Sequence, residues 1–305
     1  MDKIQMELFE QLTGLHEIPA GAYNIRANSK KDSRNTTSNI DIVTKEDKDG
    51  IDIYIKPGTK NESVHIPVVI SQTGLEECVY NDFYIEDGAN VNIIAGCGIH
   101  NSGCNDARHD GIHTFHIGKD AIVHYEEKHY GEGEGTGARI LNPVTDIYVG
   151  ENSVFTMDTV QIEGVDSTKR ETDITMEAGS RLTVTEKLMT HDRQEAVSNM
   201  KVIMDGDGSS AQIISRSVAK GESIQTFHPR AIGKTACHAH IQCDSIIMND
   251  AQVRSIPEID ARNVDAQIIH EAAIGRINSE QLLKLETFGL NEEEAEGVII
   301  ENFLN

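Results

Sequence analysis

The chain has 305 residues, and its 50 Asp and Glu residues against 27 Lys and Arg residues give a formal net charge of −23. This charge argues against nucleic acid as a partner, because phosphate binding needs clustered Lys and Arg. Aromatic residues make up only 5% of the chain and Trp is absent, which argues against sugar-stacking clefts and aromatic platforms for single-stranded nucleic acid. No apolar run reaches about 18 residues, the length that indicates a membrane span, and the N-terminus lacks the apolar segment of a signal peptide. We therefore expect a cytoplasmic protein without membrane contact.

The N-terminal part of the chain predicts a helix followed by strands. Apolar residues recur at helical spacing over 3–17, as expected of one amphipathic helix, and Pro19 and Gly21 interrupt this pattern. Alternating apolar residues in 51–55 and 64–70 then predict two β-strands.

A glycine-marked repeat fills the middle of the chain. About every 30 residues, a glycine opens a turn and leads into a short strand of alternating apolar residues. A fixed period with one turn and one strand per unit indicates a solenoid, and the polar, β-branched units favour a β-helix. The alternative is an antiparallel β-sandwich, whose turns usually come about every 8–12 residues. The marker glycines are Gly88, Gly118, Gly150, Gly179 and Gly208.

Two short helices are predicted after the repeat, over about 279–287 and 292–302. Each is preceded by an Asn that stands three residues before a Gln or Glu, the spacing of a capping pair, and the second has acidic residues in its first turn. These pairs are Asn278 with Gln281 and Asn291 with Glu294.

Three side chains with metal-binding chemistry lie shortly before these helices. Cys243 belongs to the apolar stretch 240–248, and His270 and Glu271 belong to the stretch 268–277. Thiolate, imidazole and carboxylate are ligand types that hold iron or an iron–sulfur cluster.

Short motifs spread over residues 60–305 connect these features to a known family. They are Ala-Gly-Cys-Gly (95–98), Gly-Ile-His-Thr-Phe-His-Ile-Gly (111–118), Gln-Cys-Asp-Ser-Ile-Ile-Met (242–248), Pro-Glu-Ile (257–259), His-Glu-Ala (270–272), Ile-Gly-Arg-Ile (274–277), Glu-Gln-Leu-Leu (280–283), Phe-Gly-Leu (288–290) and Glu-Glu-Ala (293–295). In these motifs the chain resembles the SufB/SufD family, the scaffold proteins of the SUF iron–sulfur assembly machinery.

The resemblance implies a right-handed parallel β-helix, in agreement with the glycine period, with an N-terminal α/β segment and a C-terminal helical subdomain. We accordingly divide the chain into 1–75, 76–265 and 266–305. The resemblance also implies a non-enzymatic scaffold that assembles iron–sulfur clusters and transfers them to recipient apo-proteins. Its expected partner is a SufC-like ABC ATPase docked on the C-terminal helices. Because this chain is compact and combines the cysteine of one scaffold type with the histidine of the other, we expect a homodimer in a 2:2 complex.

The resemblance further assigns roles to single residues around a transiently bound cluster, expected to be [4Fe-4S]. Cys243 matches the family cysteine that accepts sulfur and helps to build the cluster. Glu271 matches a carboxylate needed for assembly, and His270 matches the histidine at the paired interface. Cys97 matches an internal cysteine linked to sulfur entry, and His113 matches a family histidine.

The remaining cysteines and histidines give weaker signals. Cys104 lies in a loop, where cysteines are more often exposed and reactive, so Cys97 and Cys104 either ligate metal, pass persulfide or are unrelated thiols. Cys237 resembles a metal clip with the two histidines that follow it, but strand alternation puts it on the face opposite both. Cys78 is expected to be structural. Further candidate ligands, most of them expected to be ordinary surface residues, are His109, His124, His129, His238 and His240.

Two alternative functions are also considered, together with a glycine-rich segment that resembles a nucleotide-binding loop. A β-helix carbohydrate-active enzyme would need paired carboxylates and usually an aromatic groove. A His-rich metalloenzyme would use His109, His113 and His116. The glycine-rich segment 131–137 lacks the Lys-Ser/Thr of a phosphate-binding loop, so we expect an ordinary loop there and no ATP hydrolysis by this chain.

Overall fold

Successive strands alternate between two sheets, so each turn of the chain adds a strand to each sheet. The computed structural model describes residues 1–305, apart from the side chain at position 163. The first sheet contains, in spatial order, β2 (Lys30–Asn35), β1 (Ala22–Ala27), β5 (Lys60–Ile70), β7 (Asn90–His100), β9 (Ile122–Glu132), β12 (Val154–Glu163), β14 (Arg181–Thr190), β16 (Ser210–Ala219), β18 (His238–Ile247) and β21 (Gln267–Gly275). The second contains β3 (Ile40–Thr44), β4 (Gly50–Ile55), β6 (Glu76–Ile85), β8 (Ala107–Ile117), β10 (Arg139–Leu141) with β11 (Val144–Val149), β13 (Ser167–Met176), β15 (Glu195–Met204), β17 (Ile224–Gly233), and β19 (Gln252–Ser255) with β20 (Glu258–Ala261).

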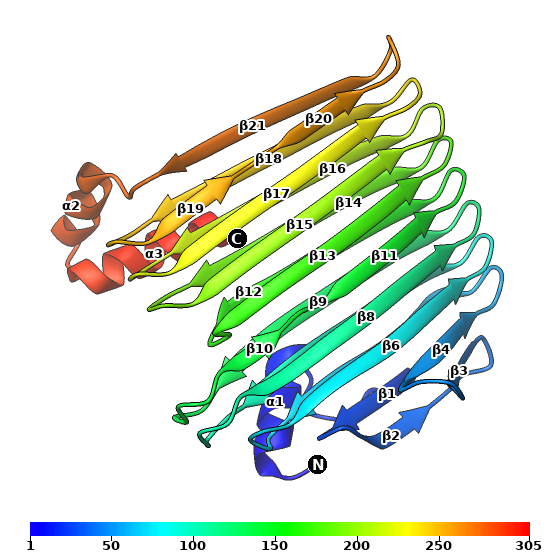
Figure 1. Cartoon of the computed structure of the whole chain (residues 1–305), viewed down its shortest axis with the longest axis horizontal. Helices are drawn as coiled ribbons and strands as arrows, with labels where there is room; N and C mark the ends of the chain where they lie inside the picture. Colours follow the sequence, from blue (N-terminus) through cyan, green and yellow to red (C-terminus); the bar gives the residue numbers. More distant parts are fainter.

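Neighbouring strands run parallel except at the N-terminal end. In-register partners such as Asn90 with Ile122 and Val154 with Arg181 show that one turn of the fold takes about 27 to 32 residues. Among the described strands, only the pairs β1–β2 and β3–β4 are antiparallel. The protein is therefore a β-solenoid of stacked parallel coils (Figure 1). The predicted β-helix is confirmed, and the antiparallel sandwich is wrong.

The marker glycines of the sequence repeat all lie in turns that lead into the first sheet. Gly88, Gly179 and Gly208 adopt φ angles of 68°, 67° and 72°, a conformation that glycine enters without a steric penalty. These turns stack through main-chain hydrogen bonds: the N–H of Gly179 donates to Asp207 O at 2.9 Å, and the N–H of Gly208 donates to Ala236 O at 2.8 Å. The stacking explains why the glycine recurs once per coil.

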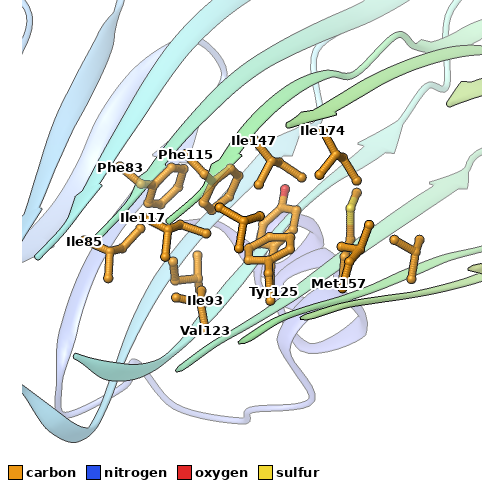
Figure 2. Packing of buried hydrophobic residues seen from close by; sticks show 14 of the residues in the cluster. Phe83, Ile85, Ile93, Phe115, Ile117, Val123, Tyr125, Ile147, Met157 and Ile174 are labelled. Carbon is orange, nitrogen blue, oxygen red and sulfur yellow. The ribbon is translucent and has the colours of Figure 1, made fainter. Parts of the chain in front are cut away.

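Inward-pointing side chains from every coil form the hydrophobic core. Phe83 and Phe115 stack with ring centroids 4.3 Å apart, and Tyr125 packs against Phe115 at 4.8 Å. Figure 2 shows these three rings side by side, with Ile147 nearby. Each large apolar side chain buried in this way stabilises the fold by about 1.5–3 kcal/mol. Because each coil packs mainly on the coils before and after it, the core is continuous along the solenoid.

Helix α1 (Lys3–Thr13) covers part of the outer face of the first sheet. Asp2 begins it with a capping box, and Gly14 ends it with a left-handed φ of 68°. This glycine stops the helix before residue 17, where the sequence pattern predicted its end. The apolar face of the helix packs on the sheet in a cluster of Leu8, Phe9, Leu12, Ile25 and Val69.

Two helices follow the last coil, as predicted. Helix α2 (Ser279–Thr287) begins at Asn278, whose side chain accepts a hydrogen bond from the Glu280 N–H at 2.8 Å instead of forming a reciprocal pair with Gln281. Helix α3 (Glu292–Leu304) begins with the predicted capping box of Asn291 and Glu294.

The two C-terminal helices differ in how they contact the solenoid. Helix α3 packs on the outer side of the first sheet, where Leu304 contacts Val218 and Met248. Helix α2 buries no side chain and projects from the corner of the molecule (Figure 1). None of the helices in the described part of the chain is long and apolar enough to cross a bilayer.

Candidate functional site

Cys243 and His270 meet on the inward face of the last two strands of the first sheet. Cys243 lies in β18, and His270 lies in β21, the final strand of that sheet. Cys243 Sγ and His270 Nε2 are 3.2 Å apart. In the register between β18 and β21, His270 pairs with Ile241 and not with Cys243. The imidazole therefore contacts a thiol two residues further along β18. The solenoid therefore brings together two of the predicted cluster ligands from positions 27 residues apart.

Both members of this pair are uncharged at neutral pH. Burial raises the pKa of the Cys243 thiol to about 11, and the residue is only 3% exposed. Burial also lowers the pKa of His270. The contact therefore joins a neutral thiol and a neutral imidazole. Because metal binding requires a thiolate, a metal ion that binds Cys243 has to displace the thiol proton.

Glu271 points to the opposite face of the sheet from His270, as adjacent residues of a strand do. Its Oε2 atom lies 3.4 Å from Nε2 of His240, and the glutamate side chain is 66% exposed. Within a single chain, Cys243 and His270 are therefore in contact, whereas the third predicted ligand, Glu271, lies on the other face of the sheet. Across the described residues, no group of three or more His, Cys, Asp or Glu side chains is arranged to hold a metal ion.

A buried polar network surrounds Cys97 inside the solenoid. Nδ1 of His113 lies 2.8 Å from the Tyr125 hydroxyl, which donates to Oε1 of Glu127 at 3.1 Å. Arg170 donates to the other carboxylate oxygen of Glu127. Cys97 lines the same small cavity as His113 and Glu127. The predicted residues Cys97 and His113 therefore share one interior site, well away from the ends of the solenoid.

Burial and charge fix the protonation of this network. Burial acts to raise the pKa of Glu127, but the Arg170 guanidinium and the neighbouring His129 and His113 together outweigh it and hold this pKa well below its usual value. Burial lowers the pKa of His113 to about 4 and raises the pKa of Cys97 well above its usual value. At neutral pH the network thus contains one buried ion pair, a neutral imidazole and a neutral thiol.

Polar side chains continue from this network toward Cys243. Arg170 lines a second small cavity together with Glu186 and Ser198. Glu186 accepts hydrogen bonds from Ser198 Oγ at 2.7 Å and from Ser215 Oγ at 3.0 Å. Ser215 is the in-register neighbour of Cys243 on the adjacent strand. We call this series the polar column; it consists of Cys97, His113, Tyr125, Glu127, Arg170, Glu186, Ser198, Ser215 and Cys243.

Most members of the polar column were not among the residues predicted from the sequence. Tyr125, Glu127, Arg170 and Glu186 occupy inward positions of their strands and are buried. The signal was available, because strand alternation puts Glu127 on the same face as the core residues Val123 and Tyr125. A charged residue at an apolar position of a strand is an unusual feature that warrants attention.

The three histidines of the proposed metalloenzyme do not converge. His109 and His113 are buried on the inward face of β8, whereas His116 points outward. The His116 ring stacks between Tyr84 and Tyr148, at centroid distances of 5.1 and 5.5 Å. The three-histidine metal site is therefore wrong, because an even and an odd position of one strand cannot share a face.

The other cysteines lie in separate environments. Cys104 is exposed, as predicted for a loop cysteine, whereas Cys97 is buried in the interior, so the two thiols occupy different environments. Cys237 is buried and His238 is exposed, which agrees with the alternation expected there. Cys78 is partly buried on β6.

The glycine-rich segment 131–137 packs tightly against a neighbouring loop. A Cβ atom at Gly135 would lie 2.3 Å from Gly103 O, and one at Gly137 would lie 2.0 Å from Asn105 O. These glycines therefore permit close backbone contact, and the prediction of an ordinary loop agrees with this packing.

Comparison with known proteins places these features in a family. The family model for the SUF system FeS cluster assembly SufBD core domain matches residues 76–303. The chain belongs to the SufBD family. An iron-sulfur cluster assembly SufBD family protein of Methanothermobacter thermautotrophicus is 25% identical over 261 residues, which cover 84% of this chain and 62% of the relative.

Two further archaeal relatives bear the same SufBD family description. The protein of Archaeoglobus fulgidus is 27% identical over 264 residues, covering 85% of this chain and 69% of the relative. The protein of Methanocaldococcus jannaschii is 24% identical over 255 residues, covering 83% of this chain and 79% of the relative. This chain spans about three fifths of the length of the Methanothermobacter relative. Membership in the SufBD family supports a role in iron–sulfur cluster assembly.

Proposed function

We propose that the protein is a non-enzymatic scaffold on which an iron–sulfur cluster, expected to be [4Fe-4S], is built and from which it passes to recipient apo-proteins. The observation that carries this proposal is the 3.2 Å contact between Cys243 Sγ and His270 Nε2 at the end of the solenoid. A thiol and an imidazole held together supply two iron ligands. An incomplete, mixed set of ligands suits a cluster that has to leave again.

The end of the solenoid near β21 supports pairing of two copies. No strand lies beyond β21 in the described part of the chain, so its outer edge is free to pair. Apolar residues are exposed close to this edge: Val264 is 99% exposed, and Ile269 and Ile274 are 48% and 42% exposed. A two-fold axis here would place two Cys243–His270 pairs near each other, with Glu271 among the outward residues of both edges. The dimer would then supply ligands that one chain lacks.

The C-terminal helices support docking of a SufC-like ABC ATPase. On α2, α3 and the turn between them, Leu283, Phe288 and Val298 are 63%, 75% and 37% exposed. An apolar surface on a short helical pair suits insertion into a groove of a partner. With one ATPase on each scaffold copy, the complete complex would have 2:2 stoichiometry.

Two matched substitutions separate these interfaces. Leu283→Asp combined with Phe288→Asp should abolish co-purification of the ATPase, whereas Val264→Asp should leave ATPase binding intact and weaken self-association. Sedimentation of each purified complex gives both stoichiometries. An ATPase that stays bound to the Leu283→Asp/Phe288→Asp variant would refute the docking site, and a strict 1:1 complex at micromolar concentration would refute pairing.

The polar column supports a connection between Cys97 and the cluster site. Cys97 and Cys243 lie at its two ends, and Cys104 is exposed. We assign Cys97 and Cys104 either to sulfur entry as persulfides or to iron binding. All five cysteines are free thiols, which suits the reducing cytoplasm where we place the protein.

Anaerobic reconstitution with ferrous iron and sulfide tests the scaffold function. The purified full chain with its ATPase should develop a brown iron–sulfur chromophore, and Cys243→Ser and His270→Gln should each weaken it strongly. Cys237→Ser is the matched control, because Cys237 is also buried, directly before the same strand, and among the described residues its thiol forms no side-chain hydrogen bond with a histidine. An equal yield of chromophore in Cys243→Ser and Cys237→Ser would overturn the assignment of the site.

A further inference from the structure

A groove crosses the outer face of the first sheet, with residues of α1 and the end of the chain after α3 among its lining. It encloses about 450 Å³ and is lined by residues of β7, β9, β12, β14 and β16. Leu12 of α1 contributes to one wall, and Asn305, directly after α3, contributes to another. Val160 and Ile214 add apolar surface to the floor. The groove is on the outside of the sheet and away from Cys243; of the polar column, only Glu127 is among its lining residues.

Three cations line this groove without a carboxylate partner. Lys128, Lys187 and Arg216 are each half-buried, and none forms an ion pair within the part of the chain that the structure describes. The Nζ atom of Lys187 reaches only Asn305 Oδ1, at 3.5 Å. Asp244, the in-register neighbour of Arg216, instead accepts a hydrogen bond from Gln242 at 2.6 Å. This absence of partners is unexpected in a chain with 50 acidic residues against 27 basic ones.

Three carboxylates line the groove, and all three contact residues outside the cation row. Glu127 points inward and accepts a hydrogen bond from Arg170. Asp158 Oδ2 lies 2.7 Å from Nε2 of His124, and Glu126 Oε1 lies 3.5 Å from Nδ1 of the same histidine. Both acidic side chains belong to a different row of the sheet from the three cations, because Asp158 pairs with Glu126 across the strands while Val160 pairs with Lys128. The positive charge of the cation row is therefore not neutralised within the groove.

The strand register sets the positions of the three charges. Lys187 and Arg216 are in-register partners on adjacent strands, so their Cα atoms are about 5 Å apart. Val160 separates Lys187 from Lys128, which places Lys128 about 10 Å from Lys187 along the row. An adjacent Lys and Arg suit one phosphate group, because the Arg fork binds two oxygens and the Lys adds a point charge. Val160 and Ile214 offer apolar contact beside it.

We propose that this groove binds a small organic phosphate, with the phosphate between Lys187 and Arg216 and an apolar or planar body along Val160 toward Leu12. Its volume lies in the range of small-molecule sites, about 300–1,000 Å³. The helices on both sides limit its length, which favours a small molecule over an extended acidic peptide. The bound anion would neutralise the cation row, which lies unpaired and half-buried without it. The proposal does not depend on cluster assembly, because no residue of the groove belongs to the Cys243 site.

Calorimetric titration of the full chain with adenosine monophosphate, inorganic phosphate and adenosine tests the proposal. We expect saturable binding of one adenosine monophosphate per chain, tighter than binding of either fragment. Lys187→Gln combined with Arg216→Gln should weaken this binding by at least about tenfold, the effect of losing a charge-assisted hydrogen bond. Lys128→Gln should have a smaller effect. Arg181→Gln is the matched control, because Arg181 lies on the same strand as Lys187, also has no ion pair among the described residues, and is outside the groove.

Three results would overturn the proposal. One is the absence of saturable binding of adenosine monophosphate to the unmodified chain. Another is equal affinity in the Lys187→Gln/Arg216→Gln variant and in Arg181→Gln, with circular dichroism showing both to be folded. The third is a tetraglutamate peptide that binds as tightly as adenosine monophosphate and competes with it, since this would identify the groove as a docking site for an acidic peptide.

Discussion

Replacing Arg170 with methionine should leave Glu127 as a buried carboxylate without its cation. Glu127 is 3% exposed and Arg170 is 5% exposed, so solvent can replace little of the lost interaction. Removing one partner of a buried ion pair destabilises a protein by about 3–5 kcal/mol. The hydrogen bond from Tyr125 remains and compensates for only part of this loss. We expect Arg170→Met to lower the free energy of unfolding by about 3–5 kcal/mol at pH 8.

The loss should depend on pH in a direction that the structure fixes. Without Arg170, burial is opposed by the neighbouring histidines, of which His129 Nε2 lies 3.6 Å from Glu127 Oε1. Because burial is the largest single influence, we expect the Glu127 pKa to rise above its value in the unfolded chain. The folded variant then binds a proton that the unfolded chain does not, so its stability falls as the pH rises above about 4.5. The slope reaches at most about 1.4 kcal/mol per pH unit. The intact pair lacks this slope, because its Glu127 pKa is held low.

Urea unfolding followed by circular dichroism at pH 5 and pH 8 measures both effects. The double variant Arg170→Met/Glu127→Gln removes both charges of the pair, so it should be more stable than Arg170→Met at pH 8 and should lose the extra pH dependence. A stability of Arg170→Met within about 1 kcal/mol of the unmodified chain at pH 8, or an equal loss at both pH values, would refute the reasoning.

Further predictions concern single residues. With a pKa of about 11, Cys243 should react with iodoacetamide about tenfold faster for each pH unit between 7 and 10, measured by mass spectrometry. His113 takes up a proton below pH 6.5 in the unfolded chain but only near pH 4 in the folded chain. As the pH falls through this window, the free energy of unfolding should therefore decrease by as much as about 3 kcal/mol. His113→Gln should remove this decrease. In Gly137→Ala the new Cβ would lie 2.0 Å from Asn105 O, so this variant should be destabilised by about 1–3 kcal/mol. In Gly297→Ala, within α3, the new Cβ meets no atom within 4 Å, so this variant should stabilise the helix by about 0.5–1 kcal/mol.

Each of these three predictions has a control or an outcome that would contradict it. The exposed Cys104 reports on the reagent in the same sample, and a Cys243 rate that levels off below pH 9 would contradict burial of its thiol. An unchanged acid slope in His113→Gln would show that another group titrates. If Gly137→Ala unfolds at the same urea concentration as the unmodified chain, the loop is less tightly packed than its backbone contacts indicate.

The sequence was sufficient to predict the architecture, because solenoid coils repeat the same local requirements. A glycine that opens each turn and apolar residues at alternate positions recur along the chain, and both features are local. The capping box of Asn291 and Glu294 is local as well, and it marks the start of α3 correctly. The division of the chain at residues 75 and 265 stays a prediction.

The polar column could not be predicted, because it depends on which coils face each other across the core. Glu127 and Arg170 are 43 residues apart and belong to different sheets, so no short-range pattern connects them. Closeness in sequence also did not predict which cluster ligands lie together. His270 and Glu271 are adjacent in sequence, but strand alternation directs their side chains to opposite faces of the sheet. The contact of His270 with Cys243 depends on the register between β18 and β21, which only the folded structure specifies.

The edge strands at the two ends of the solenoid differ in how readily another strand can pair with them. At the N-terminal end, the outermost strand β2 runs antiparallel to its neighbour and carries Lys30, Lys31 and Asp32, charges that discourage pairing at a sheet edge. At the other end, no further strand lies beside β21 in the described part of the chain. A rod with two pairing ends would polymerise into filaments, since every added molecule would expose a new edge. If two copies pair as proposed, their contact would use both β21 edges, and growth would stop at a closed pair.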